Sequence, residues 1–242
     1  MNPRWSAQWL RSAQPARRDL WRGVEAQHQV ATMRLVDTID EQLALEQILE
    51  ASKPPIPVDA YGTHYLVFTP FRYTPPWPSR FRRAGEPGLW YGADDPQTVC
   101  AELAWWRWRF LQDSEGLRGD HVITEHTLFK AGFDGFELDL TVEPWRALRG
   151  AWRDPADYSA CHALADAVRA ATPAIDAIRY ESARRERSLC AAVFHAGALT
   201  IQEPNAQQTW ICKTTATAVL FTCNANGGSM AFDFRSGATG PG

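Results

Sequence analysis

Several easily recognised functional motifs are absent from this 242-residue sequence. It contains no CxxC pair, no GxGxxG and no GxxxxGK(S/T), so neither of the two most familiar glycine-rich phosphate loops is present. The five cysteines are odd in number and widely spaced, and no two of the six histidines are spaced to share one helical face. This distribution predicts buried, reduced thiols and no metal site.

Long apolar runs and a strong charge of one sign are also lacking. No segment approaches the roughly 18 apolar residues that a membrane-spanning helix requires, and the charged N-terminal segment does not resemble a secretion signal. We therefore expect a cytoplasmic protein without membrane contact. The net charge of -3 gives no overall attraction to nucleic acid, so any bound anion must meet a local cluster of positive side chains.

The pattern of apolar residues predicts an α+β fold with a mixed, split β-sheet and flanking helices, because expected strands follow one another instead of alternating with long helices. We divide the chain into a helical N-terminal extension (1–60), one α+β domain (61–225) and a flexible C-terminal tail (226–242), with residues 1–23 as a short helix or an arm. Helices are expected at 30–49, 96–112 and 158–171, and strands at 64–71, 121–129, 135–143, on both sides of Ser182, and within 209–224.

Four arginines, Arg72, Arg80, Arg82 and Arg83, lie in or next to a stiff, proline-rich loop that extends to Pro87. Arginines in such loops are most often solvated surface residues. Arg80 stands out because a guanidinium held between prolines and aromatic rings is preorganised for bidentate phosphate recognition. Arg72 is the second candidate, and the other two are expected at the rim of a binding site.

Glu102 lies in the second turn of the helix expected to begin at Asp95-Pro96. The apolar residues Val99, Leu103, Trp106 and Phe110 form one stripe of this helix, and Glu102 is at the edge of that stripe. An exposed, helix-favouring glutamate is the simpler interpretation. The apolar surroundings instead favour a carboxylate that needs a partner, since an unpaired charge there is costly.

Ser182 follows a predicted strand at a polar turn, in the run RYESARRER. Most serines at such positions cap a neighbouring amide, and no GxSxG motif marks this one as a nucleophile. If Ser182 is functional, we expect it to donate a hydrogen bond to a ligand. The eleven tryptophans, several of them on the Glu102 helix, are expected in the core or in a protein interface.

The order of SRF, LWYGADDPQTVCAE and RYESAR resembles the RES domain, from about Tyr65 to Cys223, and the helical N-terminal part resembles the ParT-like branch of RES toxins. Carried over by position, Arg80 matches the family arginine, Tyr91 the tyrosine, Glu102 the glutamate and Ser182 the serine. Two departures are Ser79 in place of the usual glycine and Arg82-Arg83 where the family often has asparagine or a small residue.

This resemblance implies an ADP-ribosyltransferase-like fold, a homodimer, an Xre-type antitoxin as partner, and cleavage of the nicotinamide–ribose bond of NAD+, which is a substrate and not a cofactor. In this interpretation Arg80, helped by Arg72, binds the diphosphate, and Tyr91 packs on nicotinamide or ribose. Glu102 stabilises the developing ribose cation, and Ser182 donates to an oxygen of the ligand. The acceptor stays open between water, phosphate and a protein side chain.

Two other functions are compatible with the sequence. A catalytically inactive module could bind a partner protein through the tryptophan-rich face, and the arginine loop could bind nucleic acid, although the negative net charge disfavours the latter. The interaction module predicts that the pure protein does not turn over NAD+ and that a partner protein binds it stably. The second predicts duplex binding with a steep dependence on salt.

Overall fold

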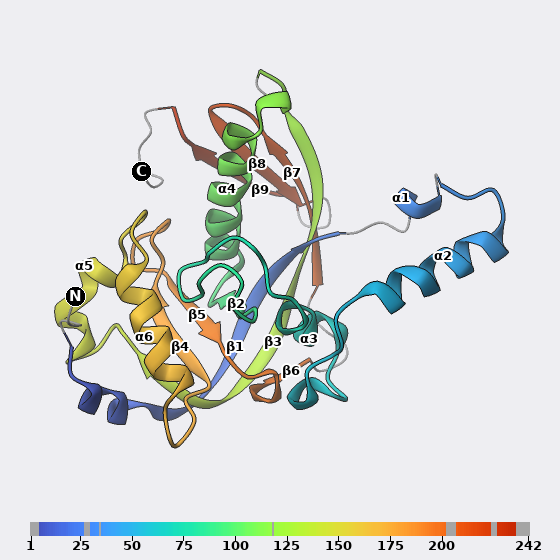
Figure 1. Cartoon of the computed structure of the whole chain (residues 1–242). Helices are drawn as coiled ribbons and strands as arrows, with labels where there is room; N and C mark the ends of the chain where they lie inside the picture. Colours follow the sequence, from blue (N-terminus) through green and yellow to red (C-terminus); the bar gives the residue numbers. More distant parts are fainter. Residues whose placement is uncertain are drawn as a thin grey trace.

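The computed structural model of the chain describes residues 5–26, 30–33, 35–117, 119–201, 207–223 and 227–235 (Figure 1). Within these ranges nine strands form one mixed sheet, in which only the pairing of β3 with β4 is parallel. The strands are β1 (Gln14–Glu25), β2 (Trp90–Ala93), β3 (Val122–Asp139), β4 (Ala177–Glu181), β5 (Leu189–Val193), β6 (Leu199–Thr200), β7 (Gln207–Thr214), β8 (Ala218–Cys223) and β9 (Gly228–Asp233).

The sheet closes on itself around β3. β1 pairs with both β3 and β2, and the order β2, β5, β4 leads back to β3, so these five strands form a ring. β7, β8 and β9 extend the sheet from the first half of β3. Because β3 belongs both to the ring and to this extension, the N-terminal strand β1 and the C-terminal strands β7 to β9 are parts of one continuous sheet.

In the described part of the chain, six α-helices accompany this sheet. They are α1 (Val30–Met33), α2 (Ile39–Ser52), α3 (Tyr65–Arg72), α4 (Pro96–Asp113), α5 (Arg149–Trp152) and α6 (Ser159–Arg169), with short 3-10 helices at 7–12, 58–60, 115–117, 145–148 and 196–198. Of these, α4 and α6 pack into one core and α3 into the other. Figure 1 shows α2 extending away from the sheet. No helix within the described ranges combines the length and apolar character needed to cross a bilayer.

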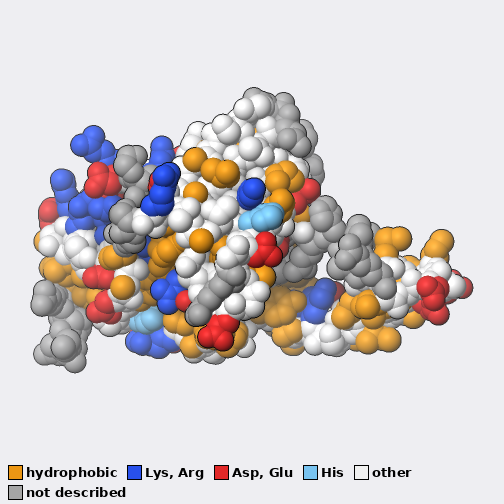
Figure 2. Space-filling view, turned by 90° about the horizontal axis from the view of Figure 1, so that it is seen from above, with side chains coloured by type: hydrophobic (Ala, Val, Ile, Leu, Met, Phe, Trp, Pro, Cys, Tyr) orange, Lys and Arg blue, Asp and Glu red, His pale blue; other side chains and the backbone are white. Residues whose placement is uncertain are grey.

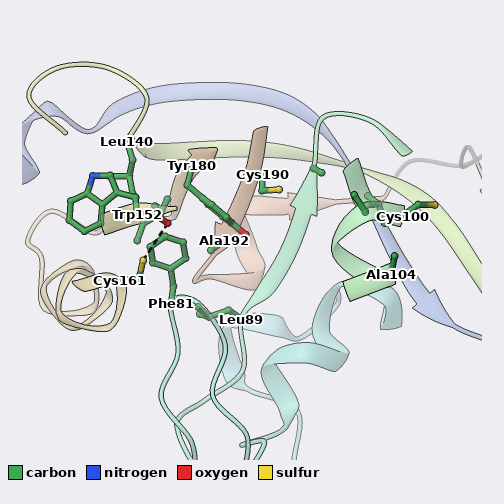
Figure 3. Packing of buried hydrophobic residues seen from close by; sticks show 14 of the residues in the cluster. Phe81, Leu89, Cys100, Ala104, Leu140, Trp152, Cys161, Tyr180, Cys190 and Ala192 are labelled. Atoms are coloured by element: carbon green, nitrogen blue, oxygen red, sulfur yellow. Dashed lines mark hydrogen bonds between the residues drawn. The ribbon is translucent and has the colours of Figure 1, made fainter. Parts of the chain in front are cut away.

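Two cores result, because successive strand residues point to opposite faces. Leu128 and Ala192 belong to the core that includes residues of α4 and α6, whereas Phe129 and Ala191 belong to the core under α3. All five cysteines are buried and unpaired, as predicted. Figure 3 shows Cys100, Cys161 and Cys190 among the apolar side chains of the first core.

The α+β class and the mixed sheet with flanking helices are confirmed, but several elements differ from the prediction. The expected N-terminal arm contains β1, which pairs with twelve residues of β3. The strand expected at 64–71 is the helix α3, the two strands at 121–143 are one strand, and residues 228–233 of the expected flexible tail are β9. In each case tertiary pairing or packing overrides local propensity.

Gly88 lies near the end of the loop that connects α3 to β2, where it packs against α3, and its replacement by alanine is expected to destabilise the protein. A Cβ atom there would lie 1.8 Å from the carbonyl oxygen of Pro70, a backbone atom that cannot rotate away. Overpacking of this kind costs about 1–3 kcal/mol. We expect Gly88→Ala to lower the free energy of unfolding by about 3 kcal/mol in chemical denaturation.

Gly150 provides the matched control, since a Cβ atom there meets nothing within 4 Å and the residue lies in α5. Alanine favours a helix over glycine by about 1 kcal/mol, so Gly150→Ala is expected to leave stability unchanged or slightly increased. Equal stabilities of the two variants would contradict the close approach of Gly88 to α3.

Candidate functional site

A cleft of about 240 Å³ lies over the closed part of the sheet, between α4 and the proline-rich loop. Strands β1, β2, β4 and β5 form its base, and α4 contributes one wall with Glu102. Arg80 and Tyr91, which were predicted as site residues, line the same cleft. The complete lining is Arg22, Gly23, Ser79, Arg80, Tyr91, Gly92, Ala93, Val99, Glu102, Leu103, Trp106, Tyr158, Tyr180 and Cys190.

Glu102 is placed by the start of α4. Asp95 accepts a hydrogen bond from the amide of Thr98 and Pro96 occupies the first helical position, so the helix begins where the sequence predicts. The residues of the predicted stripe do not all enter the core: Val99, Leu103 and Trp106 line the cleft beside Glu102, and Phe110 is 53% exposed. The carboxylate therefore lies among apolar groups at a cleft wall.

Ser182 holds the Glu102 carboxylate. Its Oγ lies 2.6 Å from Oε1 of Glu102 and also accepts hydrogen bonds from the amides of Arg184 and Arg185, at 3.0 and 3.1 Å. Because the two amides occupy the acceptor positions of the hydroxyl, its proton is directed to Glu102. Ser182 is buried and does not line the cleft, so its hydroxyl orients the carboxylate rather than facing a ligand directly.

Arg80 is fixed by a loop that is itself anchored in the core. Phe81 inserts next to Tyr180, with ring centroids 4.9 Å apart, and Figure 3 shows it among Tyr180, Trp152 and Cys161. Nη1 of Arg80 donates to the carbonyl oxygens of Trp152 and Asp154, at 2.8 and 2.9 Å. Residues far apart in the sequence thus set the direction of this guanidinium.

The structure gives no hydrogen bond from Nε or Nη2 of Arg80 to an oxygen or nitrogen atom of the described residues, although the Cys161 thiol contacts the guanidinium. The guanidinium carbon lies 4.8 Å from the ring centroid of Tyr158, which also lines the cleft, and the whole residue is only 7% exposed. A largely buried cation that points into a cleft with free donors is suited to bind an anion.

Tyr91 connects β2 to the Arg80 loop. Its hydroxyl accepts a hydrogen bond from the amide of Phe81 at 3.1 Å and lies 2.8 Å from Oγ of Ser79. Burial raises the pKa of the Tyr91 phenol, so the group stays protonated at neutral pH. The hydroxyl fixes the two residues that flank Arg80, and the ring faces the cleft.

Arg22 of β1 is a second cleft arginine that the sequence did not reveal. Burial lowers its pKa to about 10, so it remains charged at neutral pH. Nη1 donates to the carbonyl of Tyr91 at 2.9 Å, the guanidinium carbon lies 5.4 Å from the Trp90 ring centroid, and Nε is buried without a partner. The run Leu20-Trp21-Arg22-Gly23-Val24 was the available signal, but the surrounding charges obscured the strand.

Arg184, another buried arginine, packs against Trp105 of α4, the helix that carries Glu102. Its guanidinium carbon is 3.8 Å from the ring centroid of Trp105, and Nη2 donates to the carbonyl of Pro155 at 3.1 Å. Burial lowers the pKa of Arg184, while the Glu102 charge opposes this shift. Trp105 therefore packs on a cation, and Trp108 stacks on Phe234, which leaves less of the predicted tryptophan-rich face exposed.

Two other predicted arginines have different roles from those expected. Arg72 ends α3, where it donates to the carbonyl of Pro54 and pairs with Glu50 at 2.6 Å, and it does not line the cleft. Arg82, expected at the rim, is only 6% exposed and donates to carbonyl oxygens of its own loop. This buried guanidinium therefore joins parts of the proline-rich segment, in addition to the backbone hydrogen bonds between Ser79 and Arg82.

This arrangement places one carboxylate, Glu102, in a cleft with two guanidinium groups, those of Arg22 and Arg80. No second carboxylate is among the described lining residues, and the described residues contain no group of three metal-binding side chains. The cations suit an anionic ligand, and a carboxylate shielded by apolar groups suits a reaction in which positive charge develops.

The sequence profile of the RES domain matches residues 56–214, which include Arg80, Tyr91, Glu102 and Ser182. No curated protein sequence matches the chain. Among solved structures, the crystal structure of the MbcT–MbcA toxin–antitoxin complex of M. tuberculosis is similar, with a TM-score of 0.47 and 13% identity over 83% of this chain and 90% of that chain. Because the profile match spans more than half of the sequence, the chain belongs to the RES domain family.

Proposed function

We propose that this protein cleaves the nicotinamide–ribose bond of NAD+ and acts as the toxin of a toxin–antitoxin pair. The observation that carries this proposal is the contact between Ser182 and Glu102 in the cleft shared with Arg80. The contact orients an anionic group where a sugar cation would form, and Arg80 supplies a positive group for the diphosphate of the same ligand. The RES family resemblance, which implies this reaction, supports the same residues.

The reaction fits a site with one carboxylate. When the bond between the ribose C1 and the pyridinium nitrogen breaks, both electrons stay on nitrogen and nicotinamide leaves as a neutral molecule. The positive charge passes to the ribose, where the Glu102 carboxylate stabilises it electrostatically. The leaving group needs no proton, so no general acid is required.

The guanidinium groups of Arg80 and Arg22 would bind the diphosphate and direct the nicotinamide end of the substrate into the cleft. Arg80 has free donors toward the cleft, and Arg22 carries a buried Nε without a partner. A volume of about 240 Å³ is less than that of most small-molecule pockets, which enclose about 300–1,000 Å³. The cleft would therefore enclose the nicotinamide riboside half, with the adenosine half across its mouth.

The antitoxin and the homodimer remain proposals that rest on the family resemblance. An Xre-type antitoxin would inhibit the enzyme by placing a segment in the cleft. Trp106 supports this, since it lines the cleft and is 42% exposed, and an aromatic side chain at a cleft mouth offers apolar area to a partner.

Incubation of the purified protein with NAD+, followed by mass spectrometry, tests the reaction. We expect nicotinamide release in all conditions. The second product identifies the acceptor: ADP-ribose for water, a ribose-phosphorylated form when phosphate is added, or a modified polypeptide when a target protein is present. Phe110→Ala is a suitable control for the preparation, because Phe110 is exposed on the same helix and does not line the cleft.

The catalytically inactive interaction module predicts the opposite result. If the pure protein, freed of any copurifying partner, releases no nicotinamide at substrate concentrations up to the millimolar range, the proposed reaction is wrong. A partner protein that binds stably to this inactive chain would then favour the interaction module.

A further inference from the structure

A second and larger cavity, of about 440 Å³, lies beside α5, where β4 ends and β5 begins. Four arginines, Arg146, Arg149, Arg153 and Arg187, and one acid, Glu181, supply its charged groups. Figure 2 shows that Lys and Arg side chains gather at the end of the molecule that carries α5. A cavity with this excess of positive charge attracts anions even though the protein as a whole is slightly acidic.

Glu181 neutralises only part of this charge. Arg149 donates to both of its carboxylate oxygens at 2.5 Å, and Nε of Arg153 lies 3.6 Å from Oε1. The hydrogen bond from Arg149 lowers the pKa of Glu181, so the acid stays ionised and the pair is complete. In the part of the chain that the structure describes, the side chains of Arg146 and Arg187 have no acidic partner.

The other residues that line the cavity are mostly apolar, and two of them are largely buried. Leu140, Trp152 and Leu189 contribute to its lining, together with Thr141. An apolar surface surrounded by guanidinium groups matches a small molecule that combines an anionic group with an apolar or aromatic part, and the volume is within the range of small-molecule pockets, about 300–1,000 Å³.

We propose that this cavity binds a phosphate monoester with an aromatic part, such as a nucleoside monophosphate. The free guanidinium groups of Arg146 and Arg187 bind the phosphate, because the planar donors of arginine match phosphate oxygens in pairs. The aromatic part lies on the apolar lining. This inference does not depend on the cleavage of NAD+.

The position of the cavity connects it to the cleft. Nε of Arg153 donates to the carbonyl of Ser182 at 3.0 Å, and the carbonyl of Trp152 accepts the bond from Arg80. Arg153 and Trp152 also line the second cavity. A ligand there contacts residues that hold Arg80 and Ser182 in place, without entering the cleft.

Calorimetric titration with AMP and with inorganic phosphate, at constant ionic strength, tests the proposal. We expect AMP to bind more tightly than phosphate, and Arg146→Gln/Arg187→Gln to weaken AMP binding about tenfold or more, since hydrogen bonds to charged groups are lost. Both residues are exposed and without acidic partners, so the fold is expected to remain intact. Arg146→Lys/Arg187→Lys, which keeps the charge, provides a milder variant for the same measurement.

The matched control is Arg17→Gln/Lys213→Gln, which removes the same charge from two exposed positions that line neither cavity. We expect this control to retain AMP affinity within about twofold, as exposed charges contribute little. Unchanged AMP affinity in Arg146→Gln/Arg187→Gln, or an equal loss in the control, overturns the proposal. Loss of the same binding in Arg22→Gln, a cleft variant without a hydrogen bond to any residue of the second cavity, would place the phosphate in the cleft and would also overturn it.

Discussion

Replacing Glu102 with glutamine is expected to lower the rate of nicotinamide release by about 100- to 1,000-fold, the range found when one preorganised electrostatic group is removed from an active site. Glutamine keeps the size of the side chain and the carbonyl oxygen that accepts the 2.6 Å bond from Ser182. Only the negative charge is lost. The effect should appear in kcat, with a KM for NAD+ close to that of the unchanged protein, because the charge acts on the transition state.

The variant Ser182→Ala tests how much the orientation of the Glu102 carboxylate contributes to the rate, separately from its negative charge. It keeps the carboxylate of Glu102 but removes the hydroxyl that donates to it and accepts from the amides of Arg184 and Arg185. Loss of one hydrogen bond to a charged group gives an intermediate decrease, about tenfold or more. Full turnover in a folded Glu102→Gln protein would remove the carboxylate from the mechanism, whatever the result for Ser182.

The sequence identified the parts of the site that depend on local rules. Asp95-Pro96 marks a helix start by its capping chemistry, and this start determines where Glu102 lies on α4. Motif order brought Arg80, Tyr91 and Glu102 to attention, and these three line one cleft. The helix start was inferred from residues within a short segment, whereas the three cleft residues were inferred from the resemblance to the RES domain.

Contacts between distant segments could not be predicted in this way. The carbonyls that hold Arg80 belong to Trp152 and Asp154, and Ser182, which follows β4, donates to Glu102 on α4. β1 was missed for a related reason. Its sequence, QPARRDLWRGVE, mixes charged and apolar residues without a regular alternation, and only its pairing with β3 makes the segment a strand and brings Arg22 into the cleft.

Arg80→Lys is expected to raise the KM for NAD+ about tenfold to 100-fold while leaving kcat less affected. The guanidinium uses Nη1 for the carbonyls of Trp152 and Asp154 and keeps its other nitrogens for the ligand. A lysine ammonium has three protons, and the same two carbonyls would engage two of them. It also lacks the planar pair of donors that fits a phosphate. Steady-state kinetics with NAD+ measures the change.

Arg82→Lys is the matched control, because Arg82 lies in the same loop and is equally buried, at 6% exposure against 7% for Arg80. Its guanidinium donates to the carbonyls of Pro75 and Arg83 and does not line the cleft. We expect both variants to lose stability, as each loses bonds to backbone oxygens. Only Arg80→Lys should change the KM strongly. If Arg82→Lys raises the KM as much, the effect comes from the folding of the loop, and Arg80 does not bind the substrate through its free donors.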